Sequence, residues 1–305
     1  MRDIHCHILP GVDDGARDMA ESLAMLEAAK RAGVTSIVCT PHCRRPYFDY
    51  EAMWESFRDL KAHAGGFPLT MGFEVNWDAL MELGLDDWAP YLGIQGPSFC
   101  GDGAQTFLLE LSSGAPRSQF GSYQETVWQL QGMGYDVVIA HPERYRAIQD
   151  DLSLAEDFRR AGCKLQASCD FVAGGRLGHE KRPARRLFER GMYDYIASDA
   201  HRVEHYELLA KAVARFGVGT DGAGDAEKAA LDAGWTQELG AAGYRVPLAR
   251  RAASAVPVVD FGFDDDDRDA QDGVGAEYSS TTQDKAAKAM GDFGVVAPKP
   301  KHFKR

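Results

Sequence analysis

Residues 1–15 read MRDIHCHILPGVDDG, and they place His5 and His7 at the end of the first strand-like run of the chain. Successive side chains of a strand point to opposite faces, so His5 and His7 lie on the same side. Two acids, Asp13 and Asp14, follow in a turn. Imidazoles on one face followed by carboxylates suit a metal site. Because a lone His-X-His pair is more often incidental, the rest of the sequence has to decide.

Strand-like runs alternate with amphipathic stretches along the first 216 residues. The runs expected to form strands are 2–7, 34–40, 68–75, 106–112, 135–141, 164–168 and 193–198. The stretches expected to form helices are 21–33, 51–65, 123–134 and 181–191, each closing with Gly. This alternation indicates the α/β class with a mostly parallel sheet. About seven units favour a closed or nearly closed barrel over an open doubly wound sheet.

The composition excludes several classes of protein. The 305 residues are 45% hydrophobic and 26% charged, with a net charge of −12, so we expect no nucleic-acid partner that binds through a basic face. No apolar run approaches the roughly 20 residues of a membrane span, and no signal-peptide pattern opens the chain. The six cysteines form no CxxC pair. We therefore expect a cytoplasmic protein without membrane insertion.

The composition changes after residue 216. Residues 217–250 are rich in Gly, Ala and Asp, and we expect a weakly structured extension there. Residues 251–305 are acidic and then basic, and this low-complexity tail is expected to be mostly disordered. The predicted barrel is therefore confined to residues 1–216.

Acid and imidazole side chains recur where the predicted strands end. The carboxyl ends of strands in a parallel barrel converge on one face, so these groups are expected to meet there. Glu110 lies inside an apolar run, where an unpaired carboxylate needs a partner such as a cation. The set is expected to favour Mn²⁺, Fe or Zn²⁺ over Mg²⁺ or Ca²⁺. The candidate metal ligands are His5, His7, Asp14, His42, Glu74, Glu110, His141, Asp199 and His201.

The motifs DIHCHILPGVDDG, TPH, GFE, LLEL, AHPERY and SDAH, in this order, resemble those of the polymerase and histidinol phosphatase (PHP) superfamily. They are closest to the bacterial manganese-dependent tyrosine-protein phosphatases of capsule and exopolysaccharide operons. The resemblance implies a distorted (β/α)₇ TIM-like barrel with a three-metal Mn²⁺ site held by the nine residues above. It also implies that Glu74 bridges two metals and that Arg144 contacts phosphate. Asp13 remains an alternative to Asp14 as the turn ligand.

Hydrolysis of a phosphate monoester needs neutralised oxygens, a nucleophile and a stabilised leaving group, and clustered divalent ions suit the first two needs. Arg144 offers a planar fork for phosphate oxygens. Asp199 or His201 is expected to pass a proton to the leaving oxygen. The expected partner is the phosphotyrosine-bearing tail of a bacterial tyrosine kinase, and the loop after His42 (RRPYFDY) offers aromatic and cationic contacts to it. The sequence leaves a homo-oligomer open.

Several alternatives compete with this interpretation. Cys39 and Arg45 have the C-x5-R spacing of cysteine-dependent phosphatases, but Pro41 lacks the N–H that a phosphate-binding loop needs. A small-molecule phosphatase of the histidinol-phosphate type, a nucleotide phosphoesterase and a 3′-exonuclease use similar metal ligands. A metal-binding regulatory module without turnover is a further alternative.

Overall fold

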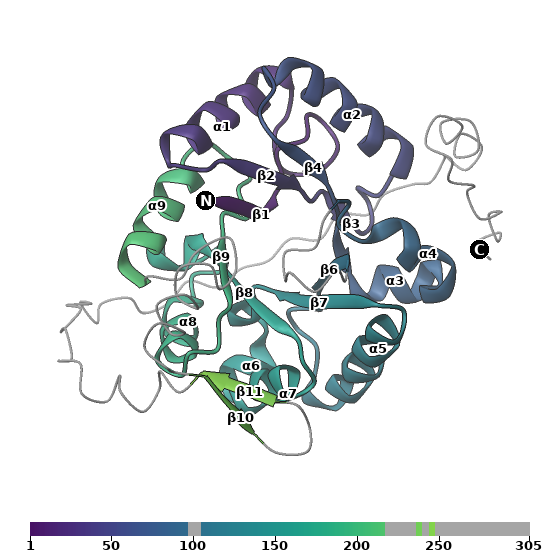
Figure 1. The fold of residues 1–305 in the computed structure, drawn as a ribbon, viewed down its shortest axis with the longest axis vertical. Coiled ribbons are helices and arrows are strands. Elements are labelled where there is room, and N and C mark those ends of the chain that lie inside the picture. The colour runs from purple at the N-terminus through teal and green to yellow at the C-terminus, as the bar shows by residue number, and fades with distance from the viewer. Residues whose placement is uncertain (97–104, 217–235, 240–243, 248–305) are drawn as a thin grey trace.

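Parallel strands surrounded by helices make up the first 216 residues of the chain (Figure 1). The computed structural model describes residues 1–96, 105–216, 236–239 and 244–247. The extension expected at 217–250 and the disordered tail expected at 251–305 lie outside the described residues. The exception is a two-stranded antiparallel pair of β10 (Thr236–Leu239) and β11 (Tyr244–Pro247).

The strands of residues 1–216 form two parallel sheets. One has the order β1-β2-β4, and the other has the order β3-β5-β6-β7-β8-β9. Because β3 continues the course of β2, and β5 that of β4, the described strand segments correspond to seven β/α positions. This confirms the distorted seven-unit barrel. The strands are β1 (Arg2–Cys6), β2 (Ser36–Cys39), β3 (His42–Cys43), β4 (Leu69–Met71), β5 (Glu74–Asn76), β6 (Gln105–Glu110), β7 (Tyr135–Ala140), β8 (Lys164–Ser168) and β9 (Tyr195–Ala197).

One predicted strand is broken in two. The run 68–75 was expected to be continuous, but it divides into β4 and β5, which belong to different sheets. Gly72 lies at the break, where a Cβ would come within 2.8 Å of Ile94 Cγ1, so a side chain does not fit. The short strand β3 was not predicted, because Pro41 interrupts the preceding run and cannot donate to a ladder. The distortion of the barrel comes from these two breaks.

Backbone hydrogen bonds join the two sheets at both seams. On one side, His7 N donates to Ala200 O at 3.0 Å and Asp199 N donates to His5 O at 2.8 Å, which ties β1 to the end of β9. On the other side, Gln95 N donates to Met71 O and Ile94 N donates to Thr106 O, both at 2.8 Å. The first seam brings the opening motif next to the SDAH motif, although almost 200 residues separate them.

Helices cover the outside of the barrel (Figure 1). The four predicted helices are confirmed as α1, α2, α5 and α8; Asp18 and Asp49 cap the first two, as short acidic side chains do at helix starts. None of the described helices is long and apolar enough to cross a membrane. The helices are α1 (Met19–Arg31), α2 (Tyr50–His63), α3 (Trp77–Leu83), α4 (Leu85–Leu92), α5 (Phe120–Gly132), α6 (Arg146–Asp150), α7 (Ser153–Arg160), α8 (Lys181–Glu189) and α9 (His205–Phe216), with 3₁₀ turns η1 (Arg117–Gln119), η2 (Pro142–Arg144) and η3 (Cys169–Ala173).

The core has two parts. A large cluster packs the strands against the surrounding helices, and a smaller one includes Ile4, Val38, Leu108 and Val138 from four different strands. The register between β1 and β2 shifts between Asp3 and Cys6, so β1 carries one extra residue there. Beyond this irregularity, imidazole and carboxylate side chains lie at or near the ends of several strands, and these side chains form the candidate site.

Candidate metal centre

The nine side chains expected as metal ligands lie together at the carboxyl ends of the strands. Their nitrogen and oxygen atoms form four overlapping groups, and within each group all atoms lie within 4.8 Å of one another. The nine come from six separate segments of the chain. Seven of them are at most 8% exposed, and Asp14 and Glu110 are partly buried. The groups are His7–Asp14–His42–His201, His5–Glu74–His141, His5–His7–Asp199 and His42–Glu74–Glu110.

His5 of β1 and His7, the residue directly after that strand, face each other through their Nε2 atoms, 3.2 Å apart. His5 Nδ1 lies 2.9 Å from Gln166 Oε1, and His7 Nδ1 lies 2.9 Å from Asp13 Oδ2. Both partners are acceptors, so the Nδ1 atoms carry the protons and donate them. In the neutral tautomers, the Nε2 lone pairs then point into the cluster. Hydrogen bonds of this kind fix the tautomer and the ring orientation of histidines that bind metals.

Glu74 lies at the centre of the cluster. Its Oε1 is 2.7 Å from His141 Nε2 and 3.4 Å from His5 Nε2. Its Oε2 is 2.6 Å from His42 Nδ1 and 3.4 Å from His7 Nε2. Each carboxylate oxygen therefore serves a different pair of imidazoles, which suits the bridging position that the resemblance implies.

The two acids in the turn after β1, Asp13 and Asp14, contact different residues. Asp14 Oδ1 lies 3.0 Å from His42 Nε2 and 3.3 Å from His201 Nε2. Asp13 accepts instead from His7 Nδ1 and from the backbone N–H groups of Gly15 and His42. The geometry favours Asp14 as the ligand and gives Asp13 the task of orienting His7.

Glu110 lies at the edge of the cluster. Its side chain is 13% exposed and accepts a hydrogen bond from Asn76 Nδ2 at 3.1 Å. Glu110, the last residue of β6, thus has one of the partners that the sequence indicated it needs. It still lies 4.0 Å from His141 Nε2 and in one group with His42 and Glu74.

Several acceptors in the cluster are buried without a hydrogen bond, namely Asp14 Oδ1, Glu74 Oε2 and Asp199 Oδ1. Buried acceptors are normally satisfied, and a cation satisfies carboxylate oxygens that face one another. Imidazole and carboxylate donors in this number suit a first-row divalent ion. The residues present therefore fit a metal.

The electrostatics of the cluster lead to the same conclusion. Although burial opposes the charged form, Glu74 and Asp199 raise the pKa of His5 to about 10, and Glu74 and Asp14 raise that of His42 to about 9. Burial also opposes ionisation of Glu74, yet His5 and His42 hold its pKa well below the usual range. The carboxylates thus demand positive charge, which protons or cations can supply.

The backbone is unusual at two residues of the cluster. His141 has φ 29° and Asp199 has φ 46°, which are left-handed values. Non-glycine residues adopt such values rarely, and they concentrate at functional sites. His141 directly follows β7, and Asp199 lies two residues beyond the end of β9.

Arg144 is 9% exposed and lies against the cluster. Its Nη2 lies 2.6 Å from Asp199 Oδ2 and 3.0 Å from Asp170 Oδ2, and it donates to Ser168 Oγ at 3.1 Å. Burial opposes its charge, but Asp199 and Asp170 raise its pKa, so it stays cationic. Its Nε is buried, donates no hydrogen bond and lies 4.0 Å from the buried Glu180 Oε1.

The residues that hold the candidate ligands include several that the sequence did not reveal. Gln166 orients His5, and Asp170 and Ser168 hold Arg144. Glu143 accepts from Ser168 N at 2.8 Å and from Tyr193 Oη at 2.7 Å. A polar residue inside an apolar strand, as Gln166 is in KLQAS, is the one available signal, because such a residue needs a buried partner.

The cysteine-dependent alternative fails on the geometry of its nucleophile. Cys39 is fully buried in β2, and burial raises the pKa of its thiol well above the usual range. Arg45 is exposed and pairs with Glu82, with Nη2 and Oε1 2.7 Å apart. A thiolate nucleophile needs a lowered pKa and access to substrate, and Cys39 has neither.

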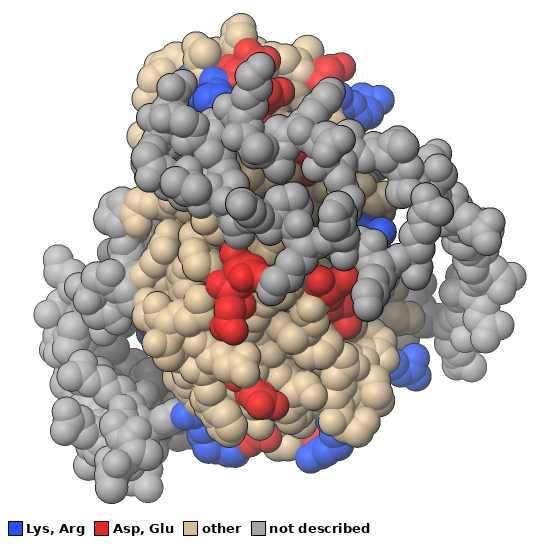
Figure 2. All heavy atoms as spheres, turned by 90° about the vertical axis from the view of Figure 1, so that its right-hand side faces the viewer, with Lys and Arg blue, Asp and Glu red and all other residues tan. Residues whose placement is uncertain are grey.

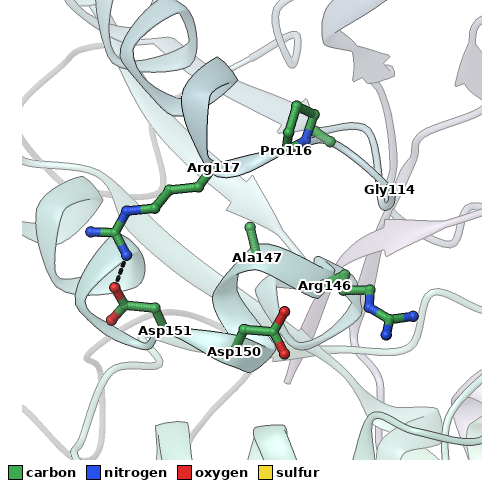
Figure 3. Close-up of a pocket in the computed structure, with 8 residues that line it drawn as sticks. Gly114, Pro116, Arg117, Arg146, Ala147, Asp150 and Asp151 are labelled. Atoms are coloured by element: carbon green, nitrogen blue, oxygen red, sulfur yellow. Dashed lines mark hydrogen bonds and ion pairs between the residues drawn. The ribbon is translucent and has the colours of Figure 1, made fainter.

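A separate hollow of about 430 Å³ lies between the segment around η1 and helix α6 (Figure 3). Its charged lining consists of Arg117, Arg146, Asp150 and Asp151. Arg117 and Asp151 form an ion pair across it (Figure 3). Two arginines balanced by two aspartates give no preference for an anion, so the phosphate chemistry belongs to the cluster.

The surface around α3 and α4 is acidic. Asp78, Glu82 and Asp86 are exposed there. Figure 2, which views the molecule from this side, shows acidic side chains at the centre of the face and basic ones mostly toward its edges. The described residues of this face offer no continuous basic surface for a nucleic acid.

The fold and the cluster define a parallel α/β barrel with a candidate metal centre at the carboxyl ends of its strands. The family model for capsular polysaccharide synthesis, CpsB/CapC, matches residues 1–214. The chain belongs to this family.

Named relatives and a solved structure agree with this assignment. The tyrosine-protein phosphatase YwqE of Bacillus subtilis is 33% identical over 219 residues, covering 67% of this chain and 78% of that protein. CpsB of Streptococcus pneumoniae, also a tyrosine-protein phosphatase, is 29% identical over 232 residues, covering 69% and 90%. A chain from the crystal structures of YwqE and CpsB, described as metal-dependent tyrosine phosphatases, matches with a TM-score of 0.57 and 30% identity, covering 70% of this chain and 87% of that chain. The resemblance to capsule-operon phosphatases is confirmed.

Proposed function

We propose that this chain is a metal-dependent tyrosine-protein phosphatase of capsule or exopolysaccharide synthesis. Its substrate is the phosphotyrosine-bearing tail of a bacterial tyrosine kinase, it acts in the cytoplasm, and its cofactor is Mn²⁺ in a three-ion site. The single observation that supports this most is the cluster of nine imidazole and carboxylate side chains, in which three buried carboxylate oxygens, one each on Asp14, Glu74 and Asp199, accept no hydrogen bond. The family membership and its tyrosine-phosphatase relatives support the reaction type.

The nine residues would hold the cations, with Glu74 shared between ions and Asp14 in the outermost group. Divalent ions bound there neutralise charge on phosphate oxygens and lower the pKa of water in the site. Arg144 contributes a fixed positive charge beside Asp199, and charge-assisted hydrogen bonds to phosphate are the strong ones. Because Asp199 and Asp170 hold the guanidinium, it is already oriented before substrate arrives.

The leaving oxygen of tyrosine needs little help, since a phenol has a pKa of about 10. Burial opposes ionisation of Asp199, but Arg144 and His5 hold its pKa well below the usual range, so it is a poor proton donor. His201 directs Nε2 toward Asp14 Oδ1, 3.3 Å away, and its Nδ1 donates to Asp199 O. Nε2 would hold a cation there, so neither residue is a good proton donor, and a phenol leaving group does not require one.

The rim beside His42 suits an aromatic phosphoester. The ring of Tyr47 stacks against that of His42, with 5.8 Å between centroids, and the Arg44 guanidinium lies 5.8 Å from the centre of the Tyr47 ring. Arg44 is 33% exposed on its side chain. A cationic and aromatic edge next to the cluster can receive the ring of a phosphotyrosine while a flexible peptide passes outside.

A substrate panel tests the proposal. The full chain, loaded with Mn²⁺, is given a phosphotyrosine peptide, histidinol phosphate or a short single-stranded DNA, and phosphate or nucleotide release is measured. We expect the phosphotyrosine peptide to be hydrolysed with the highest kcat/KM. Equal or faster release from histidinol phosphate would assign a small-molecule phosphatase, and no release from any substrate would favour a regulatory module.

Two controls separate metal from thiol chemistry. A chelator should abolish hydrolysis, and added Mn²⁺ should restore it. Cys39→Ser should retain turnover, because the Cys39 thiol is buried away from the cluster. Activity that survives chelation and disappears in Cys39→Ser would reverse the assignment.

A further inference from the structure

The segment between η3 and α8 is a closed loop of residues 174–180, with the sequence GGRLGHE. Glu180 is fully buried, and its two carboxylate oxygens accept from the backbone N–H groups of Leu177 at 2.8 Å and His179 at 3.2 Å. Gly175 has φ +84°, and a Cβ there would lie 2.0 Å from Glu180 Oε2. The loop thus wraps around a carboxylate and needs glycine at this point.

This loop presents Arg176 to the outermost group of the cluster. Arg176 Nη2 donates to Asp14 Oδ2 at 2.6 Å, and Nη1 lies 3.2 Å from His201 Nε2. The side chain is 45% exposed. Arg176 therefore differs from Arg144, which is buried and held by Asp199 and Asp170.

Both contacts of Arg176 involve candidate metal ligands, but they respond differently to a cation. His201 Nδ1 donates to Asp199 O at 2.8 Å, so its Nε2 has a lone pair and accepts from Arg176. One lone pair serves either an N–H donor or a cation. Asp14 has two oxygens, and only Oδ1 lies within the group with His42 and His201, so Oδ2 can keep Arg176.

We propose that Arg176 pivots on Asp14 and serves as a second phosphate-binding arginine. In the metal-free protein its Nη1 satisfies His201, and a cation that takes Nε2 releases this donor. The freed guanidinium edge, still anchored by Asp14 Oδ2, then donates to the phosphate of the substrate. This inference rests on the proposed function, because it takes the substrate to be a phosphate monoester bound beside the cations.

Two binding measurements on the full chain test the exchange. Mn²⁺ is titrated into metal-free protein by calorimetry, and inorganic phosphate is then titrated into the Mn²⁺-loaded protein. In Arg176→Ala, the weakest Mn²⁺ site should bind about fivefold tighter, since a competing hydrogen bond is gone, and phosphate should bind about tenfold more weakly. Opposite shifts of the two affinities are the signature of the exchange.

Arg190→Ala is the matched control, because Arg190 is 47% exposed and pairs with Glu156 at 3.1 Å, outside the cluster. It should change neither affinity. Arg176→Gln, which is polar but shorter and uncharged, gives the same test if the alanine variant does not fold. Unchanged affinities, a change in only one of them, or weakening of both would overturn the proposal. If the wild type shows both bindings but hydrolyses no phosphotyrosine, the proposed function fails while the role of Arg176 in anion binding stands.

Discussion

Two buried aspartates at the seam between β1 and β9 have opposite surroundings. Asp3 is fully buried, and its oxygens accept from Ser198 N at 2.9 Å and from Ser198 Oγ at 2.5 Å. Asp199 is 2% exposed, yet its Oδ1 lies 3.3 Å from His7 Nε2 and 3.5 Å from His5 Nε2 without accepting a hydrogen bond. Burial is common to both residues, so the unmet acceptors are what distinguish a candidate ligand from a structural carboxylate.

The pKa values of the two residues differ accordingly. Burial raises the pKa of Asp3 to about 6, against the hydrogen bonds from Ser198. Burial acts in the same direction on Asp199, but Arg144 and His5 hold its pKa well below the usual range. Asp3 therefore belongs to a network of uncharged hydrogen-bond partners, whereas Asp199 stays negatively charged, as a cation site requires.

The largest effect is expected from removing the charge of Asp199. In Asp199→Asn the size of the side chain is kept, and asparagine tolerates the left-handed backbone. The protein should therefore stay folded, and Asp170 should remain paired with Arg144. Turnover should fall roughly a thousandfold because a candidate ligand is lost. Phosphate release and bound manganese are measured together. Full metal content with normal turnover would show that Asp199 is not a ligand.

A methyl group at Gly15 should disturb the same side of the seam. In Gly15→Ala, the Cβ would lie 2.0 Å from His7 O and 2.6 Å from His7 Cβ, so the backbone that carries His7 must move. We expect a loss of about 3 kcal/mol in the free energy of unfolding, together with weaker metal binding.

Gly121→Ala is its control, because nothing lies within 4 Å of that Cβ in α5. It should gain up to about 1 kcal/mol, measured by the same denaturant titration. Equal stabilities for the two variants would contradict the close approach at Gly15.

Asp3→Asn tests the structural member of the pair. In this variant an amide NH₂ group replaces one carboxylate oxygen and faces a hydrogen-bond donor of Ser198, so one hydrogen bond is lost. The free energy of unfolding should fall by about 2 kcal/mol. Turnover should match that of the wild type wherever both proteins are folded. Loss of metal from folded Asp3→Asn would erase the distinction between the two aspartates.

Gln166→Leu should have the smallest effect of the series. It removes the acceptor that orients His5 Nδ1, while an apolar side chain suits the interior of β8. Metal affinity should fall about tenfold, as is usual when a ligating histidine loses the hydrogen-bond partner that orients it. A calorimetric Mn²⁺ titration measures this change, and an unaltered isotherm would mean that packing alone orients His5.

The sequence predicted the parts of the molecule that follow from strand geometry. The carboxyl ends of parallel strands converge, and so the imidazoles and acids at or just after the ends of six of the seven predicted strands lie in one cluster. The helices α1 and α2 were predictable because their periodicity and their caps, Asp18 and Asp49, agree. These features depend on near neighbours in the chain or on a simple repeat.

Features that depend on close approach between distant segments escaped prediction. The break at Gly72 follows from the position of Ile94, which no local pattern reveals. The same holds for Gln166, whose partner His5 is 161 residues away, and for Arg176, 162 residues from Asp14. The choice between Asp13 and Asp14 also needed coordinates, since adjacent residues in a turn have equal reach.

The left-handed backbone at His141 and Asp199 also limits how this centre can be re-engineered. Each such conformation carries a cost of about 1–3 kcal/mol, which the surrounding fold compensates. A β-branched residue does not fit the left-handed backbone at either position. A residue that brings a thiol or amide donor must also adopt this backbone conformation before its side chain can bind an ion. Attempts to shift metal selectivity by exchanging donor residues should therefore begin at positions with ordinary strand backbone, such as His42 and Glu74. His141 and Asp199 should be left unchanged.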